Sequence, residues 1–429
     1  MKMDDQHGRR SLPISSRSGR LFRFAVFSVI LFLCICAMKR EQILWLLTVS
    51  TGASAVPVVI MQEFLPLRFS GNGTFQIAVF EDLHYGEAED LDWGPAADVK
   101  STRVMNTILD AELPNLVVLN GDLITGENTF LENSTHYVDE IVAPLVRRGI
   151  PWASTYGNHD IEYNLSTQAL LKRENRYPLS LTRSMIQGPN AGVSNYYLPV
   201  YSSDLTNPTL RLLLWFFDSR GGKAFQELDE NGNEVFVPGN VDDSVAQWFT
   251  STNAALQQRY NRTIPSLAFV HIPVHASFSF QQEGVDAHKE PGINDDNPMA
   301  HQGITCVDNV CTYTGQDIPF MSALANTPGM MAMFSGHDHG NDWCFRWDSR
   351  LPDMNITGNG MALCFGRHSG YGGYGSWTRG SRQIFLDEST LGKSVETWIR
   401  LEDESISGAV ILNSTYGLDD YPAVNKTFT

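Results

Sequence analysis

Basic residues are scarce in this chain of 429 residues: 31 lysines and arginines stand against 48 aspartates and glutamates, which gives a net charge of −17. A nucleic-acid-binding protein needs a basic face to meet the phosphates, so we expect no binding of nucleic acid. An acidic protein that handles phosphate needs another local source of positive charge. Bound metal ions can supply that charge.

The apolar run near the N-terminus is too short for an ordinary membrane span. It covers residues 24–38, which is 15 residues against the roughly 20 that a bilayer requires. A start at Met38 would instead give basic residues, an apolar run at 43–49 and the small residues 53–55, which together resemble a complete signal peptide cleaved after Ala55. Residues 1–55 are therefore a cleaved signal peptide, which we favour, or a signal anchor. In the second case residues 24–38 would hold a type II membrane protein with its main domain on the lumenal or extracellular side.

Cysteines are also few, and two of the six lie in the N-terminal apolar run. The other four are Cys306, Cys311, Cys344 and Cys364. Their spacing lacks the paired C-x-x-C pattern of a structural zinc site. An even number of cysteines downstream of a signal sequence indicates disulfide bonds, for which four cysteines allow three pairings.

Seven Asn-x-Ser/Thr sequons follow the leader, and none has proline at the middle position. They begin at Asn72, Asn133, Asn164, Asn261, Asn355, Asn413 and Asn425. Together with the leader and the cysteines, they predict a glycoprotein that is secreted or resides in the secretory pathway.

Short apolar segments alternate with segments of helical periodicity, which predicts layered α/β structure. We expect strands at 75–80, 116–119, 152–156, 212–217, 267–270 and 330–334, helices at 98–112, 134–148, 241–259 and 316–325, and antiparallel strands at 382–387, 395–401 and 408–412. No internal repeat or low-complexity linker divides residues 56–429. We therefore expect one domain with its core at about 74–390, a β-rich C-terminal extension to 429, and a long, polar, irregular insert at about 277–316.

Residues of the types that commonly bind metals follow the expected strands. They are Asp82, His84, Asp122, Asn158, His159, His271, His337 and His339. The carboxyl ends of strands form the usual site of α/β proteins. A buried Asp or His costs several kcal/mol unless it is paired or binds a metal, so the whole set predicts a metal centre.

The residue types fit two divalent ions about 3.5–4 Å apart, which can clamp a phosphate group and activate a water. Asp122 is the natural bridge between such ions, because one carboxylate has two oxygens. Neutral imidazoles and the amide oxygen of Asn158 bind metals without cancelling their charge.

Five motifs carry a resemblance to a known family. They read DLH (82–84), GDLITG (121–126), GNHD (157–160), VHIP (270–273) and GHDH (336–339). In this order they resemble the calcineurin-like metallophosphoesterases, and the phrases around His271 and His337 are most similar to the purple-acid-phosphatase-related branch of fungi and plants. The resemblance implies a four-layer α/β/β/α sandwich with two mixed sheets and a two-metal phosphoesterase activity.

The same resemblance assigns a role to each position. The first metal would be held by Asp82, His84, Asp122 and His339, and the second by Asp122, Asn158, His271 and His337. His159 would contact the phosphate or protonate the leaving oxygen, and Asp160 would orient His159.

One departure from true purple acid phosphatases concerns the metals. Thr125 stands where those enzymes have the tyrosine that binds Fe(III) and gives the colour, and His84 stands where they have a different first motif. We therefore expect Mn, Fe(II) or Zn rather than a ferric–tyrosinate centre.

Three further features have weaker support. The glycine-rich segment 366–375 is either a flexible connection or a loop over the substrate, in which Arg367 or His368 contacts phosphate. His275 is a possible substitute for His271 as a ligand. The acidic residues at 294–297 are expected to be a solvated loop.

Among the three cysteine pairings we favour Cys306–Cys311 with Cys344–Cys364. The first would close a short loop inside the irregular insert. The second would join the segment after His339 to the strand that leads into the glycine-rich segment, and would hold both at the mouth of the site.

The function that these patterns predict is phosphomonoester hydrolysis by two divalent metal ions, with a phosphate ester as substrate. The same metals would serve a phosphodiesterase or nucleotide hydrolase. A third alternative is a secreted binding glycoprotein with a degenerate site, against which the complete set of ligand positions argues.

Overall fold

The computed structural model describes residues 66–307 and 310–429. The predicted leader at residues 1–55 lies outside these residues, so the choice between signal and anchor stays a prediction. The described residues belong to one compact unit. Within the described ranges, no helix combines the length and apolar character that a membrane crossing requires.

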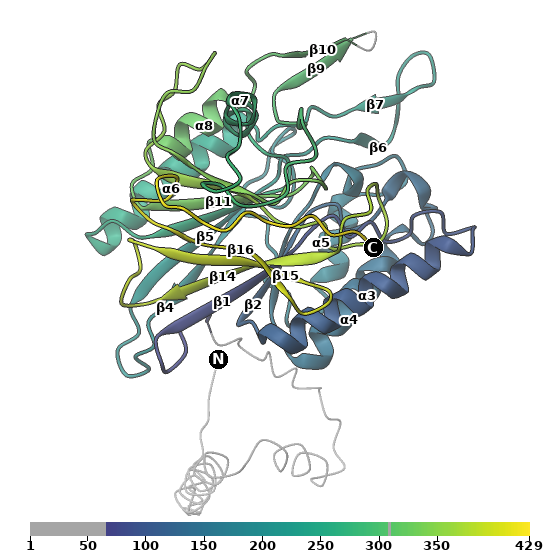
Figure 1. The fold of residues 1–429 in the computed structure, drawn as a ribbon. Helices are drawn as coiled ribbons and strands as arrows, with labels where there is room; N and C mark the ends of the chain where they lie inside the picture. Colours follow the sequence, from purple (N-terminus) through teal and green to yellow (C-terminus); the bar gives the residue numbers. More distant parts are fainter. Residues whose placement is uncertain (1–65, 308–309) are drawn as a thin grey trace, which may run out of the picture. The chain divides into compact units, whose positions relative to one another are not determined.

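Two six-stranded mixed sheets form the centre of this unit (Figure 1). The first has the strand order β16-β15-β14-β1-β2-β3. Its strands are β1 (Thr74–Phe80), β2 (Leu116–Asn120), β3 (Trp152–Thr155), β14 (Gly380–Asp387), β15 (Val395–Leu401) and β16 (Ile406–Leu412). Strands β1, β2 and β3 are parallel, whereas β14, β15 and β16 are joined by antiparallel pairing.

The second sheet has the order β12-β13-β11-β8-β5-β4. Its strands are β4 (Tyr196–Tyr201), β5 (Leu210–Phe217), β8 (Ser266–Val270), β11 (Met330–Ser335), β12 (Cys344–Trp347) and β13 (Met361–Phe365). The four inner strands are parallel, and the edge strands β4 and β12 are antiparallel to their neighbours.

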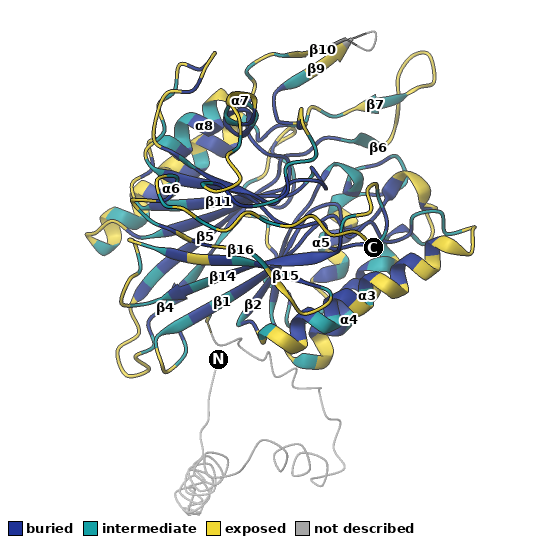
Figure 2. Ribbon diagram, viewed as in Figure 1, coloured by how far each residue is buried: buried dark blue, intermediate teal, exposed yellow. Residues whose placement is uncertain are grey.

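Side chains alternate between two cores along each strand. In β1, Ile77 and Val79 pack between the two sheets, while Ala78 and Phe80 pack toward the helices on the other face. Helices α3 (Trp93–Glu112) and α4 (Tyr137–Arg148) cover the first sheet, and α6 (Asp243–Tyr260) and α8 (Ile318–Ala325) cover the second. Figure 2 shows the result: strands are largely buried, and the helices expose one side. The predicted four-layer α/β/β/α sandwich is confirmed.

One expectation about the chain's organisation needs correction. The segment 277–316 is not irregular throughout, because it begins within helix α7 (His275–Glu283) and contains the hairpin of β9 (Ile304–Val307) and β10 (Val310–Tyr313). The β-rich C-terminal residues continue the first sheet, because β14 pairs with β1, β15 with β14 and β16 with β15. The remaining elements are α5 (Thr167–Glu174) and the hairpin of β6 (Lys223–Leu228) and β7 (Glu234–Phe236).

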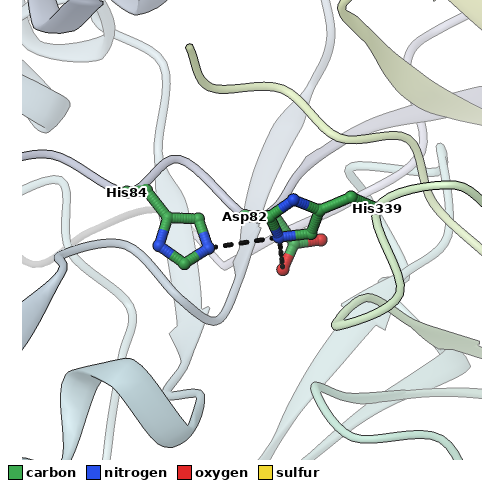
Figure 3. A group of neighbouring side chains, drawn as sticks. All are labelled: Asp82, His84 and His339. Carbon is green, nitrogen blue, oxygen red and sulfur yellow. Dashed lines mark hydrogen bonds and ion pairs between the residues drawn. The ribbon is translucent and has the colours of Figure 1, made fainter. Parts of the chain in front are cut away.

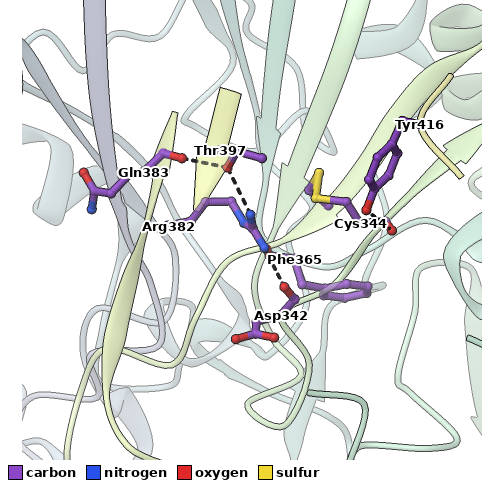
Figure 4. The surroundings of a disulfide bond; sticks show 8 residues. Asp342, Cys344, Phe365, Arg382, Gln383, Thr397 and Tyr416 are labelled. Atoms are coloured by element: carbon purple, nitrogen blue, oxygen red, sulfur yellow. Dashed lines mark hydrogen bonds between the residues drawn. A yellow bond between two sulfur atoms is a disulfide. The ribbon is translucent and has the colours of Figure 1, made fainter. Parts of the chain in front are cut away.

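Both predicted disulfides are present, and each joins directly opposed residues of an antiparallel strand pair. Cys306–Cys311 links β9 to β10, and Cys344–Cys364 links β12 to β13. Figure 4 shows the second bond beside Tyr416, whose hydroxyl donates to the Cys344 carbonyl at 2.9 Å. Cys344 and Cys364 belong to the core between the sheets. The bond therefore strengthens the sheet, rather than holding two loops at the mouth of the site as predicted.

Candidate metal centre

Loops that follow strands of both sheets bring the predicted ligands together. The loops after β1, β2 and β3 carry Asp82, His84, Asp122 and Asn158, and the loops after β8 and β11 carry His271, His337 and His339. Apart from Asn158, these side chains form two groups, and within each group the donor atoms lie within 4.8 Å of one another. Each group is the kind of cluster that holds one metal ion.

The first group consists of Asp82, His84 and His339, all buried (Figure 3). The Nε2 atoms of His84 and His339 lie 3.2 Å apart, and His339 Nε2 lies 3.7 Å from Asp82 Oδ1. The three side chains come from both sheets and point toward one another. The second group consists of Asp122, His271 and His337.

Asp122 lies between the two groups. Its Oδ2 atom is 2.9 Å from His271 Nε2 in the second group and 3.9 Å from His84 Nε2 in the first. A carboxylate in this position can bridge two ions, as the sequence predicts.

The hydrogen bonds around the histidines leave their inner nitrogens free to bind a metal. The Nδ1 atom of His271 is 2.9 Å from the Asn120 carbonyl, and that of His339 is 2.9 Å from the Tyr374 carbonyl. Because a carbonyl only accepts, each Nδ1 carries a proton, and in the neutral imidazole each Nε2 presents a lone pair to the group.

Two buried atoms support the same conclusion. Asn158 Oδ1 has no hydrogen-bond partner among the described residues. His271 Nε2 lies 2.9 Å from Asp122 Oδ2. Burial lowers the pKa of His271, but the carboxylates of Asp122 and Asp82 outweigh burial and raise it to about 10, so in the metal-free protein a proton occupies the place that a metal ion would take. The donor set of carboxylate, imidazole and amide oxygens therefore fits two divalent transition metals.

Backbone strain is concentrated at the same positions. Asp82, His84, Asp122 and His337 all adopt positive φ values, of 52°, 49°, 47° and 77°. Such conformations cost a non-glycine residue about 1–3 kcal/mol each and persist where the surroundings impose them, commonly at functional sites. Here they turn successive side chains of each loop toward the centre.

Two motif glycines are required by close packing. A Cβ at Gly157 would lie 2.2 Å from Asp122 Oδ1, and one at Gly121, where φ is 92°, would lie 2.5 Å from the His271 ring. Any larger residue would displace a side chain of the second group.

Burial shifts the pKa values of three candidate ligands, Asp82, His84 and His337, in the metal-free protein. Burial raises the pKa of Asp82 to about 7, with His271 opposing and Asp122 adding to the shift. Burial lowers the pKa of His84 to about 4 and that of His337 to about 3. Neutral imidazoles are the form that binds metals.

The profile of the calcineurin-like phosphoesterase family matches residues 75–341, which is more than half of the chain. This chain belongs to that family. Among similar proteins, "Probable inactive purple acid phosphatase 28" of Arabidopsis thaliana is 28% identical over 80% of this chain and 84% of its own length. "Phosphatase DCR2" of Saccharomyces cerevisiae is 29% identical over 78% of this chain and 55% of its own length. Among solved structures, this chain is similar to a dimetal phosphatase from Danio rerio. The match covers 79% of this chain and 99% of that protein's chain, with 15% identity and a TM-score of 0.48.

The surroundings of His159 differ from the prediction. Asp160 does not orient His159: its carboxylate accepts hydrogen bonds from the backbone N–H groups of Leu123, Ile124 and Gly157 at 2.9–3.2 Å. It therefore holds the loop after β2 against the loop after β3. The charged partner of His159 is Glu127, whose Oε1 lies 2.7 Å from His159 Nδ1.

Glu127 is thus a functional candidate that the sequence analysis missed. Its only sequence signal was an acidic residue directly after the GDLITG motif, in the 3₁₀ turn Gly126–Asn128. Burial lowers the pKa of His159, but the carboxylates of Asp122 and Glu127 outweigh burial and raise it to about 9. His159 and Glu127 are each about one third exposed, whereas the first-group ligands are buried, so this pair lies at the mouth of the centre.

The expectation that Arg367 or His368 contacts phosphate is corrected. Arg367 is only 2% exposed, and its guanidinium donates to the Thr378 carbonyl and to Asp342. His368 is 1% exposed and packs against the His339 ring with the centroids 3.9 Å apart. Both side chains are therefore structural: Arg367 holds Asp342 and Thr378 together, and His368 supports the ring of His339.

His275 does not replace His271. Its ring stacks on Tyr313 with the centroids 3.7 Å apart and contacts His301, and it belongs to neither ligand group.

Proposed function

We propose that this protein is a phosphoric ester hydrolase that uses two divalent metal ions, and specifically a phosphomonoesterase. The observation that carries the proposal is the position of Asp122 between two buried ligand groups. When bound, two ions polarise the phosphoryl group and lower the pKa of a water that attacks it. Asp82, His84, Asp122 and His339 would hold the first ion, and Asp122, Asn158, His271 and His337 the second.

The chain's own residues would do the remaining work. His159, held by Glu127, would donate a hydrogen bond to a phosphate oxygen or a proton to the leaving oxygen. Its backbone N–H donates to Asp122 Oδ1 at 2.8 Å, which holds the backbone of His159 against the Asp122 carboxylate.

A monoester substrate is favoured over a diester because its free phosphate oxygens match the number of groups that the site offers to bind them. Two ions and His159 offer three partners to the phosphate, and a monoester has three free oxygens where a diester has two. A nucleotide with a terminal phosphate would meet the same partners.

A second candidate function is metal binding without catalysis. This candidate is supported by the name of the similar Arabidopsis thaliana protein, which describes that protein as probably inactive. The full ligand set of this chain and its His159–Glu127 pair argue for catalysis.

For location we propose the secretory pathway. Four sequon asparagines, Asn72, Asn261, Asn355 and Asn425, are exposed and open to glycosylation. Asn133, Asn164 and Asn413 are half-buried. Disulfides are also typical of an oxidising compartment. An uncleaved leader would leave the same domain attached to a membrane.

The test is hydrolysis of p-nitrophenyl phosphate and bis-p-nitrophenyl phosphate by the chain loaded with Mn²⁺, Fe²⁺ or Zn²⁺. We expect the monoester to be hydrolysed faster. We also expect His159→Ala to keep two ions while kcat falls about 10²–10⁴-fold. Faster hydrolysis of the diester would establish the alternative substrate class, and two bound ions with no hydrolysis of any phosphate ester would establish the non-catalytic candidate.

A further inference from the structure

The ligand His339 is enclosed by a side chain from the glycine-rich segment. Tyr374 contacts it in three ways. The Tyr374 carbonyl is 2.9 Å from His339 Nδ1, the Tyr374 hydroxyl accepts from the His339 backbone N–H at 3.1 Å, and the two rings stack with their centroids 4.0 Å apart and their planes 8° apart.

Tyr374 is itself held by the acidic segment 294–297. Asp296 Oδ2 accepts hydrogen bonds from the Tyr374 hydroxyl at 2.6 Å and from the Gly340 N–H at 2.7 Å. One carboxylate oxygen therefore joins the residue after His339 to the residue that covers His339.

A second set of contacts fixes this arrangement. The Asp295 N–H donates to the Gly340 carbonyl at 2.8 Å, and Asp295 Oδ2 accepts from Trp377 Nε1 at 2.8 Å. The Asp296 carbonyl accepts from Asn341 Nδ2 at 3.0 Å. The acidic segment is therefore not the solvated loop that its composition predicts.

Exposure shows which way the enclosure faces. His339 is 2% exposed, whereas Tyr374 is 50% exposed. One face of the Tyr374 ring covers the His339 ring, and the remainder of the tyrosine meets solvent. The backbone of Gly373 lies against the same ligands, since a Cβ there would be 2.4 Å from the His339 ring and 2.9 Å from that of His84.

We propose that Tyr374 and Asp296 are positioning residues for the first metal ion. Tyr374 fixes the tautomer and the ring plane of His339, so that Nε2 points into the first group, and Asp296 holds Tyr374 in that position. Second-layer partners of this kind typically change metal affinity 10–100-fold. The inference rests on the proposed two-metal site, but not on which ester is hydrolysed.

The experiment measures metal stoichiometry and the rate at which a chelator removes each ion from the full chain loaded with Mn²⁺ or Zn²⁺. Tyr374→Phe removes the hydroxyl that binds the carboxylate, and Asp296→Asn weakens the same bond by removing the charge, while both changes keep the size of the side chain. We expect each to release one ion about 10-fold faster or more and the other ion at the wild-type rate. Because both changes act on the bond between the Tyr374 hydroxyl and Asp296, the acceleration in the double variant should be smaller than the product of the two single accelerations.

Two matched controls are available, Tyr371 on the glycine-rich segment and Asp286 before the acidic segment. The Tyr371 hydroxyl donates to Glu402 at 2.9 Å, and exposed Asp286 accepts from the His288 N–H at 2.8 Å. Tyr371→Phe and Asp286→Asn should release both ions at the wild-type rates.

Wild-type release rates in Tyr374→Phe and Asp296→Asn would overturn the positioning role and leave the two-metal site standing. Equal acceleration of both ions would also overturn it, since it would indicate general opening of the centre. A wild-type chain that binds no ion would refute the proposed function itself.

Discussion

At the scale of single residues, the centre is made by side chains that the backbone holds under strain and by partners that fix their orientation. Asp122 illustrates the first, with a positive φ of 47° and a carboxylate between the two ligand groups. Glu127 illustrates the second, since it lies 2.7 Å from the nitrogen that sets the orientation of His159.

The Glu127 contact leads to a prediction. Glu127→Gln removes the charge that holds His159, so we expect kcat to fall about 10–100-fold while KM and the two-ion stoichiometry change little. Steady-state kinetics and metal analysis measure both quantities. Exposed Glu132 in the same region provides the control Glu132→Gln, which should leave kcat unchanged. An unaltered kcat in Glu127→Gln would show that the ion pair has no part in catalysis.

Elements, the next scale, show what sequence could and could not predict. The ends of β1, β2, β3, β8 and β11 were predictable, because apolar runs stop where metal-binding residue types begin. Helix α7 was not, because it buries polar residues such as Ser277 and Gln281 and so lacks an apolar stripe. The partners of Arg367 and His159 were also beyond the sequence, since they depend on how separate loops fold against each other.

Helix α7 also leads to a prediction about pH. Burial lowers the pKa of His275 to about 4, and His301 beside it adds to the shift; Tyr313 and Asp317 complete its surroundings. A histidine whose pKa is lowered on folding contributes full stability above its unfolded pKa of about 6.5, and that contribution is lost as pH falls toward 4.

The variant His275→Phe should keep the stack on Tyr313 and abolish this proton uptake. We therefore expect its melting temperature to fall less steeply than that of the wild type between pH 6.5 and 4. The histidines of the metal centre are present in both proteins, so the difference between the two curves reports the contribution of His275 to the pH dependence. Parallel curves would mean that His275 titrates alike in the folded and unfolded chain.

For the molecule as a whole, the centre depends on the packing of two sheets. The first sheet contributes Asp82, His84, Asp122 and Asn158, and the second contributes His271, His337 and His339. Arg382 of β14 is fully buried and crosses between them, since it donates to the carbonyls of Phe365 and Asp342 (Figure 4). The fold was predictable from five motifs, whereas this cross-sheet support required the structure.

We propose that this chain hydrolyses phosphate esters with two metal ions that Asp122 would bridge. It is tested most directly by titrating the metal-stripped chain with Mn²⁺ while following p-nitrophenyl phosphate hydrolysis. Activity should be negligible without metal and should rise to its maximum as the second equivalent binds. In Asp122→Asn it should stay at least about 10²-fold lower, because the bridge loses its charge. Full activity in the metal-free chain, or near-normal turnover and metal stoichiometry in Asp122→Asn, would contradict the account.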